Sequence, residues 1–182
     1  DLDELAAKAA ADPWVREASV KRILPHTLRV TVAERVPAAL AVVHGVVRTV
    51  DATGAVLEPA GPGLCPDGPI LTGFDRLEGA ELAEALATGV RSVGRLLATN
   101  ASWGKEISEL DFSQPDRIVA VTQKPGPSIL LDVGAAERNV RDYLALAQEI
   151  ERRTGPAARV DLRWSGRISV LPDANDFPSE NN

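Results

Sequence analysis

The sequence holds one cysteine, two histidines and no methionine, and aromatic residues make up only 4% of its 182 positions. A lone cysteine cannot form an internal disulfide, and Cys65 has no neighbouring ligands with which to bind zinc. It stands in the run GPGLCPDGP, which is typical of a loop, so we interpret it as an idle or buried thiol. His26 and His44 fall in an expected turn and at an expected strand end, and we expect neither to bind a metal or to catalyse a reaction.

Motifs of the common enzyme classes are also missing. There is no glycine-rich phosphate loop, no nucleophile elbow and no HExxH helix. The net charge of −6 and the lack of a basic stripe argue against nucleic-acid binding. Asp161 and Arg163 share a face of one expected strand, and we interpret them as a surface ion pair rather than an acid–base dyad. We therefore predict a protein that is not an enzyme and that uses no cofactor or metal.

The remaining composition is that of an ordinary globular protein, with 45% hydrophobic and 25% charged residues. No signal peptide and no apolar run of about 18 residues is present, so we expect no membrane span within this chain. Trp14, Trp103 and Trp164 are the largest aromatic side chains, and core packing is the favoured interpretation for each. A chain of this length can bury a sizeable core without a disulfide or a metal.

Hydrophobic periodicity predicts an α+β fold in two parts. The run PAGPGLCPDGP, residues 59–69, is dense in proline and glycine and indicates a linker between a domain over residues 1–58 and another over residues 70–172. Residues 173–182 show no periodicity and are expected to be disordered. Helices are predicted over residues 1–12, 79–99 and 135–153, and strands over 15–24, 28–34, 38–44, 46–50, 55–57, 70–73, 106–112, 117–123, 128–133, 159–164 and 168–171.

Two hairpins have a register that can be worked out, because a slip of one residue turns every side chain to the other face. In the first, a three-residue connection of Pro25, His26 and Thr27 pairs Val20 with Val32 and leaves one face mostly apolar. A two-residue loop would mix the faces.

The last hairpin follows the same logic, with Ser165, Gly166 and Arg167 as its connection. Leu162 then faces Val170 and Trp164 faces Ile168, while Arg163 and Ser169 share the other face. Gly166 is expected in the left-handed conformation that such loops require.

Several motifs in this order resemble the extracytoplasmic part of the FtsQ/DivIB family of bacterial cell-division proteins. The first half contributes DPWVREASVKRILPHTLRVTVAERVPAAL and VVRTVDATGAVLEP, and the second half contributes ISELDFSQPDRIVAV, ILLDVG and ARVDLRWSGRISVLP. Each motif alone is weak, but their order is specific, and the resemblance covers about residues 1–172.

The resemblance implies a POTRA domain followed by a mixed or antiparallel β domain with two flanking helices. Members are single-pass membrane proteins of the division septum, anchored in the inner membrane and exposed to the periplasm. Compared with that pattern, we expect this chain to lack the cytoplasmic tail, the membrane helix and the first strand and helix of the POTRA domain, so that Val20, Val30 and Val32 are partly uncovered.

The resemblance also implies a non-enzymatic scaffold of the divisome that links early and late septal proteins. Its partners are small bitopic proteins, the FtsB- or DivIC-like and FtsL-like proteins, and the terminal strand accepts a strand from one of them. By residue, this places the partner site on Arg163, Trp164, Ser165, Gly166, Arg167, Ile168, Ser169, Val170 and Leu171, with Arg163 meeting an acidic side chain. A second interface is predicted at the edge formed by Val32, Glu34, Arg35 and Pro37.

Other interpretations remain open at this point. A different POTRA-containing protein could handle outer-membrane or secreted polypeptides by strand addition, although no second PWV…RxxPxTL unit occurs. A cell-wall hydrolase would need a convergent polar cluster, which the sequence does not show. For the predicted interfaces, Pro37 could simply end a strand, and the tail could cover the terminal edge.

Overall fold

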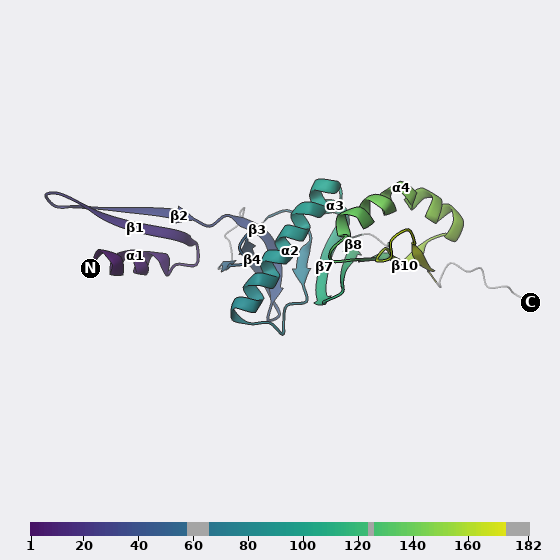
Figure 1. Cartoon of the computed structure of the whole chain (residues 1–182), viewed down its shortest axis with the longest axis horizontal. Helices are drawn as coiled ribbons and strands as arrows, with labels where there is room; N and C mark the ends of the chain where they lie inside the picture. The colour runs from purple at the N-terminus through teal and green to yellow at the C-terminus, as the bar shows by residue number, and fades with distance from the viewer. Residues whose placement is uncertain (58–65, 124–125, 174–182) are drawn as a thin grey trace, which may run out of the picture.

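A computed structural model describes residues 1–57, 66–123 and 126–173. The molecule is elongated, with a helix and a long hairpin at its N-terminal end and a sheet with two long helices forming the rest (Figure 1). Among the described residues, the strands of the hairpin pair only with each other, while nine further strands form one sheet. The fold class is α+β, as predicted from the sequence.

The N-terminal unit consists of α1 (Leu2–Ala10), β1 (Val15–Ile23) and β2 (Thr27–Glu34). Asp1 caps α1 by accepting a hydrogen bond from the backbone N–H of Asp3, and the helix packs against β1. Val20 lies opposite Val30 and Ala18 opposite Val32, so the apolar residues do share one face. The predicted partner of Val20 was two residues away, because a shift of two residues keeps every side chain on its face and hydrophobic alternation cannot detect it.

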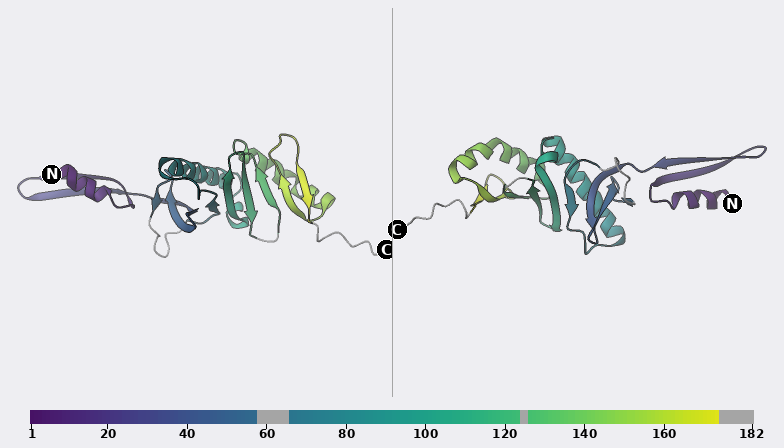
Figure 2. Two further views of the ribbon diagram at one scale, coloured as in Figure 1. Left: turned by 90° about the horizontal axis from the view of Figure 1, so that it is seen from below. Right: turned by 180° about the vertical axis from the view of Figure 1, so that it is seen from behind.

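The remaining strands form a sheet in the order β11-β10-β9-β8-β7-β6-β3-β4-β5 (Figure 2). Three pairs of neighbouring strands in it are parallel: β3 with β6, β6 with β7, and β9 with β10. The other pairs are antiparallel. The strands are β3 (Pro37–Val43), β4 (Val46–Asp51), β5 (Val56–Leu57), β6 (Ile70–Thr72), β7 (Ile107–Gln114), β8 (Arg117–Thr122), β9 (Ser128–Leu131), β10 (Ala157–Asp161) and β11 (Ser169–Pro172).

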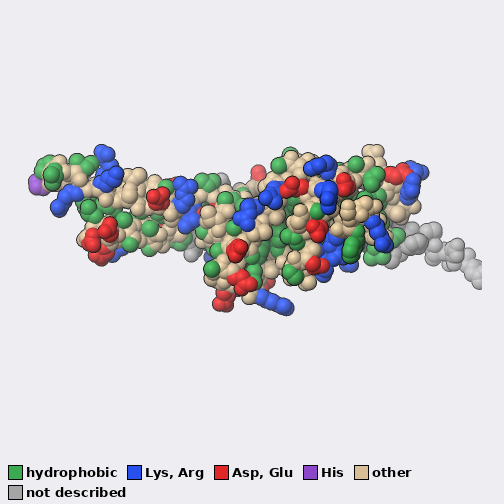
Figure 3. Space-filling model, viewed as in Figure 1, with side chains coloured by type: hydrophobic (Ala, Val, Ile, Leu, Met, Phe, Trp, Pro, Cys, Tyr) green, Lys and Arg blue, Asp and Glu red, His purple; other side chains and the backbone are tan. Residues whose placement is uncertain are grey.

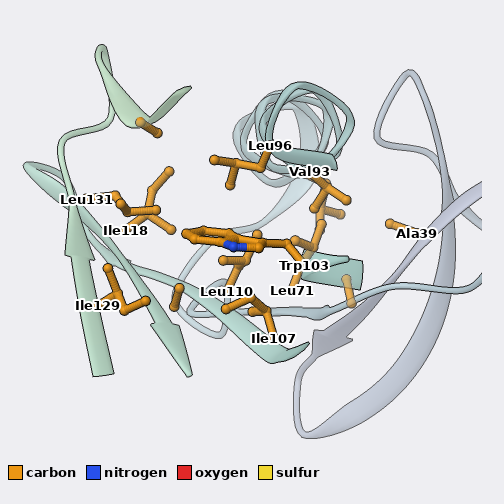
Figure 4. Packing of buried hydrophobic residues seen from close by; sticks show 14 of the residues in the cluster. Ala39, Leu71, Val93, Leu96, Trp103, Ile107, Leu110, Ile118, Ile129 and Leu131 are labelled. Carbon is orange, nitrogen blue, oxygen red and sulfur yellow. The ribbon is translucent and has the colours of Figure 1, made fainter. Parts of the chain in front are cut away.

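Two long helices, α2 (Gly79–Thr99) and α4 (Ala136–Thr154), cover one face of this sheet (Figure 1). α4 ends at Gly155, whose positive φ of 67° suits a glycine after a helix. Between α2 and β7 lies a short helix, α3 (Trp103–Glu106), which the sequence analysis did not predict. Its Trp103 is 3% exposed and fills the space between α2 and the strands (Figure 4), which confirms core packing for this tryptophan.

Strand pairing divides the chain differently from the expected division at residues 59–69. β3, β4 and β5, which lie within the predicted first domain, belong to the large sheet, because β3 pairs with β6 through Ala41 and Leu71. The predicted boundary rested on local proline and glycine content, and pairing between segments on either side of it is not a local property of the sequence. Cys65, most of the predicted linker and residues 174–182 of the predicted tail lie outside the described residues.

Candidate functional site

The predicted terminal strand, β11, lies at the end of the large sheet. β10 pairs in parallel with β9 on one side and antiparallel with β11 on the other, and β11 has one neighbour among the described strands. Val160 lies opposite Val170 and Asp161 opposite Ser169. The prediction paired Leu162 with Val170, again two residues from the observed register and on the same face.

The observed register decides which backbone groups of β11 face outward. The N–H of Leu162 donates to the carbonyl of Leu130 on the β9 side. Because backbone groups point to alternate sides along a strand, the N–H and C=O of Asp161 point toward β11. Ser169, which lies opposite Asp161, therefore directs its N–H and C=O toward β10. Val170 directs its N–H and C=O to the outer side of the sheet. An added strand would bond to Val170 and not to Ser169.

Residues 162–168 form a connection between β10 and β11 and not a pair of strand ends as predicted. Leu162 is only 2% exposed and anchors the connection in the core. Gly166 has φ of +69°, which confirms the predicted left-handed conformation, and the N–H of Arg167 donates to the carbonyl of Trp164. Trp164 is 59% exposed, so core packing is wrong for this tryptophan and its ring is available at the surface.

A groove of about 710 Å³ lies between α4 and the β10–β11 connection. Leu146 and Ile150 of α4 line one side of it, and Trp164, Ile168 and Val170 line the other. The groove therefore joins the outer strand to an apolar surface that could take side chains of a bound segment. The groove could not be predicted from the sequence, because the contribution of α4 depends on where the helix lies against the sheet.

Arg163 stands at the start of the connection and is held by two carboxylates. Its Nε and Nη2 donate to Asp161 at 3.0 and 2.9 Å, and its Nη1 donates to Asp116 Oδ2 at 3.1 Å. The hydrogen bonds from Arg163 hold the pKa of the Asp161 carboxyl below its usual range. The predicted ion pair of Asp161 and Arg163 is present, but both side chains are partly buried and do not lie freely at the surface. Asp116 lies in the turn between β7 and β8, 47 residues from Arg163, and nothing in the sequence pointed to it.

The guanidinium of Arg163 also lies 5.9 Å from the centre of the Trp164 ring, within the range of a cation–π contact. Each of the three guanidinium nitrogen atoms of Arg163 thus donates to an acceptor in the chain itself. Arg167, by contrast, is exposed. The other members of the predicted site, Ile168, Ser169, Val170 and Leu171, follow along β11 and its approach, so the structure brings the predicted residues 163–171 to one edge.

The second predicted interface is divided by the structure. Val32 and Glu34 are exposed in β2, whereas Pro37 begins β3 opposite Asp51 and does not end the hairpin. Arg35 donates from Nη1 to Asp51 Oδ2 at 2.7 Å, so its side chain contacts the large sheet. The predicted edge is therefore not one continuous surface.

Asp51 lies under the β4–β5 turn and is 4% exposed. Burial alone would raise the pKa of its carboxyl, but hydrogen bonds from Thr53, Arg35 and Ala55 outweigh burial and hold the pKa below its usual range. This carboxylate is therefore charged at neutral pH and ties Arg35 to the sheet.

Metal-binding groups do not converge in the part of the chain that the structure describes. No three side chains among the described His, Asp and Glu residues are placed to hold a metal ion. Acidic and basic side chains are interspersed over the face shown in Figure 3. Within the described residues, no helix is both long and apolar enough to cross a membrane.

Two sequence models of protein families match the chain. The model described as "POTRA domain, FtsQ-type" matches residues 1–35, and the model described as "Cell division protein FtsQ/DivIB, C-terminal" matches residues 39–163. The first match ends one residue after β2 and the second begins within β3, close to where the strand pairing changes from the hairpin to the large sheet.

Curated relatives agree. The chain is 27% identical over 174 residues to "Cell division protein FtsQ" of Geobacter sp. (strain M21), covering 93% of this chain and 63% of the relative. It is 35% identical over 160 residues to the protein of the same name from Anaeromyxobacter sp. (strain K), covering 84% of this chain and 54% of the relative. The chain thus spans between about half and two thirds of these relatives.

A search of solved structures found similarity to the major extracytoplasmic domain of the trans isomer of the bacterial cell division protein DivIB from Geobacillus stearothermophilus. The TM-score is 0.43 at 20% sequence identity, covering 66% of this chain and 97% of the other. The family assignment rests on the sequence models, of which the second alone covers more than half of the chain. The chain belongs to the FtsQ/DivIB family of cell division proteins.

Proposed function

We propose that this chain is the extracytoplasmic part of a non-enzymatic scaffold of the bacterial divisome. It links early and late septal proteins by binding FtsB- or DivIC-like and FtsL-like partners. The protein lies on the periplasmic side of the inner membrane at the division septum, and an N-terminal helix outside this chain anchors it. Support comes from the family assignment and from the solved relative, which is described as an extracytoplasmic domain.

The observation that carries this proposal is an outer strand beside an apolar groove. β11 is the last strand of the described sheet, and Val170 turns its N–H and C=O outward. Such an edge accepts a strand from another chain, and each added backbone hydrogen bond contributes roughly 1 kcal/mol net. Because β11 has only four residues, backbone bonding alone gives little affinity, and side chains of the partner must fill the groove.

Within this site, Trp164 is the aromatic anchor. When a tryptophan at the centre of an interface is a hot spot, its truncation to alanine weakens the binding free energy by about 2 kcal/mol or more. Ser165, Gly166 and Arg167 form the turn that carries the ring, and Ile168 to Leu171 supply the edge and one wall of the groove. Val32 and Glu34 remain proposed as a separate contact for another division protein on β2.

The match of the C-terminal family model favours this role over the alternative of a POTRA protein that handles outer-membrane or secreted polypeptides, because that alternative does not account for residues 39–163.

The test replaces Val170 by proline, which removes the outward N–H while proline is tolerated on an edge strand. The matched control is Val170→Ala, which shortens the side chain and keeps the N–H. We expect Val170→Pro to weaken binding of the periplasmic segment of the FtsB- or DivIC-like partner at least tenfold, measured by calorimetry, and Val170→Ala to weaken it less. Trp164→Ala should also weaken binding about thirtyfold, the fold-change that corresponds to a hot-spot side chain.

Val170→Pro and Trp164→Ala should keep the wild-type melting temperature within a few degrees, since neither Val170 nor Trp164 belongs to the fully buried core. Wild-type affinity in Val170→Pro and in Trp164→Ala would show that β11 is not the partner site. Binding lost equally in Val170→Pro and Val170→Ala would show that the groove binds the partner without an added strand.

A further inference from the structure

Arg163 begins the connection that carries Trp164, and its surroundings suggest a different role from direct contact with a partner. All three nitrogen atoms of its guanidinium donate to carboxylates of the same chain, two to Asp161 and one to Asp116. An acidic partner side chain could use only the second N–H of Nη1 and of Nη2, on a guanidinium whose charge two carboxylates already balance. A third carboxylate at this guanidinium gains little, because Asp161 and Asp116 repel it.

The same contacts join three separate parts of the fold. Asp161 ends β10, Asp116 lies in the β7–β8 turn, and Arg163 lies one residue beyond the buried Leu162. Arg117, the residue after Asp116, also contacts the Asp116 carboxylate at 3.2 Å. Two carboxylates and two guanidinium groups thus form a compact network of balanced charge. This network fixes the side chain on which the Trp164 ring rests at 5.9 Å.

Outside this network, the connection has few restraints. Residues 164–167 are exposed, Gly166 is in a left-handed conformation, and one backbone hydrogen bond, from Arg167 to Trp164, closes the turn. An exposed turn of this kind samples several conformations unless a neighbouring contact selects one. The contact present here is the guanidinium of Arg163, held from two directions.

We propose that Asp116 and Asp161 are positioning residues for the partner site: by holding Arg163 they fix the connection that presents Trp164. This inference rests on the proposed function for its partner, and on the structure alone for the restraint of Trp164. A binding surface that is ordered before the encounter spends less free energy on ordering when the complex forms. In this arrangement Arg163 supports the contact surface, and the exposed Arg167 is the cation that faces a partner.

The two roles for Arg163 predict opposite effects of Asp116→Asn. If Arg163 bound a partner carboxylate directly, loss of a competing acceptor would strengthen binding. If Arg163 positions Trp164, the same change frees the connection and weakens binding. Asp116 is exposed in a turn, so its replacement leaves the core intact. Glu137→Gln is the matched control, because it removes one carboxylate from an exposed ion pair with Arg95, at the other end of α4 from the groove-lining Ile150.

The first measurement needs no partner. The heteronuclear ¹⁵N NOE of the indole N–H of Trp164 is compared in the wild type, Asp116→Asn and Glu137→Gln, with the indoles of Trp14 and Trp103 as internal references. We expect the NOE of Trp164 to fall in Asp116→Asn alone. An unchanged NOE in Asp116→Asn, or a wild-type value as low as that of a free side chain, overturns the proposal whatever the partner is.

The second measurement is the Kd for the periplasmic segment of the FtsB- or DivIC-like partner at fixed ionic strength. Asp116→Asn should weaken binding roughly threefold to tenfold, the range expected for ordering one or two side chains, and Glu137→Gln should leave it unchanged. In a Trp164→Ala background, Asp116→Asn should change Kd by less than about twofold, since there is no ring left to position.

Tighter binding in Asp116→Asn, or a full effect in the Trp164→Ala background, would contradict the positioning role. A lower NOE of Trp164 together with unchanged Kd values in Asp116→Asn and Val170→Pro would overturn the proposed partner site while supporting the restraint of the ring.

Discussion

The N-terminal unit and the nine-stranded sheet are made from the same kinds of residue but bury them very differently. No residue of α1 is buried, and Val30 of β2 is 55% exposed, whereas Val50 of β4 is fully buried. In the sheet, strands are covered by α2 and α4 on one face, and in the hairpin a single short helix covers β1. Strand pattern and turn chemistry thus suffice to define a hairpin, but a core requires a second layer that spans it.

The largest difference is expected in backbone protection. We predict that amides of residues 15–34 exchange at least about a hundredfold faster than those of β7, β8 and β9, because an isolated two-stranded unit opens at low free-energy cost. Hydrogen exchange followed by mass spectrometry or NMR measures this directly.

The same experiment tests how the chain divides. Residues 37–57 pair within the large sheet, so their amides should exchange as slowly as those of β6 and β7. Rapid exchange throughout residues 1–57 would instead support the division at residues 59–69 that the sequence suggested. Protection of β1 and β2 equal to that of β7 would contradict the comparison itself.

Side-chain truncation sharpens the comparison at the level of single residues. Leu110 is 1% exposed at the centre of the sheet, and Leu110→Ala should lower the free energy of unfolding by about 2–5 kcal/mol through lost burial and the cavity left behind. Val30→Ala in β2 should lower it by less than about 1 kcal/mol, because much of that side chain already contacts water. Urea denaturation gives both values. Similar costs at the two sites would mean that the hairpin face is covered in solution.

Most elements were predictable because their signals are local. Leu82, Leu86 and Val93 recur at helical spacing and predicted α2 with its observed ends. The same reasoning could not fix register beyond the choice of face, so Val20 was paired with Val32 in place of Val30, and Leu162 with Val170 in place of Val160. Only the turn geometry and the packing of neighbouring strands distinguish registers two residues apart.

The candidate site was predictable as a segment but not as a surface. Residues 163–171 were identified from motif similarity, yet the exposure of Trp164 depends on β10 ending at Asp161. The groove needs α4, and the second acceptor of Arg163 comes from the distant Asp116. Contacts of this kind depend on the tertiary fold, and the sequence of one segment does not contain them.

A further prediction concerns the junction between the two regions. Arg35 donates its backbone N–H to the Trp14 carbonyl at 2.7 Å and its Nη1 to Asp51 at 2.7 Å, so one residue bonds to the hairpin unit and to the sheet. We predict that Arg35→Ala broadens the distribution of distances between spin labels at Ser19→Cys and Glu81→Cys, in a Cys65→Ser background. Lys8→Ala, which removes an exposed ion pair within α1, is the control and should leave the distribution unchanged.

The contribution of this junction should also depend on pH in one direction. The pKa of Asp51 is held below its usual range in the folded protein, so the stability it contributes is present above the unfolded value of about 3.9 and is lost as pH falls through the folded pKa. The difference in unfolding free energy between the wild type and Asp51→Asn should therefore be about 1–3 kcal/mol at pH 7 and should shrink below about pH 4. A difference that stays constant from pH 7 to pH 3 would show that the charge of Asp51 does not stabilise the junction.

A narrow distance distribution in Arg35→Ala would show that the short connection between β2 and β3 is enough to fix the two regions relative to each other.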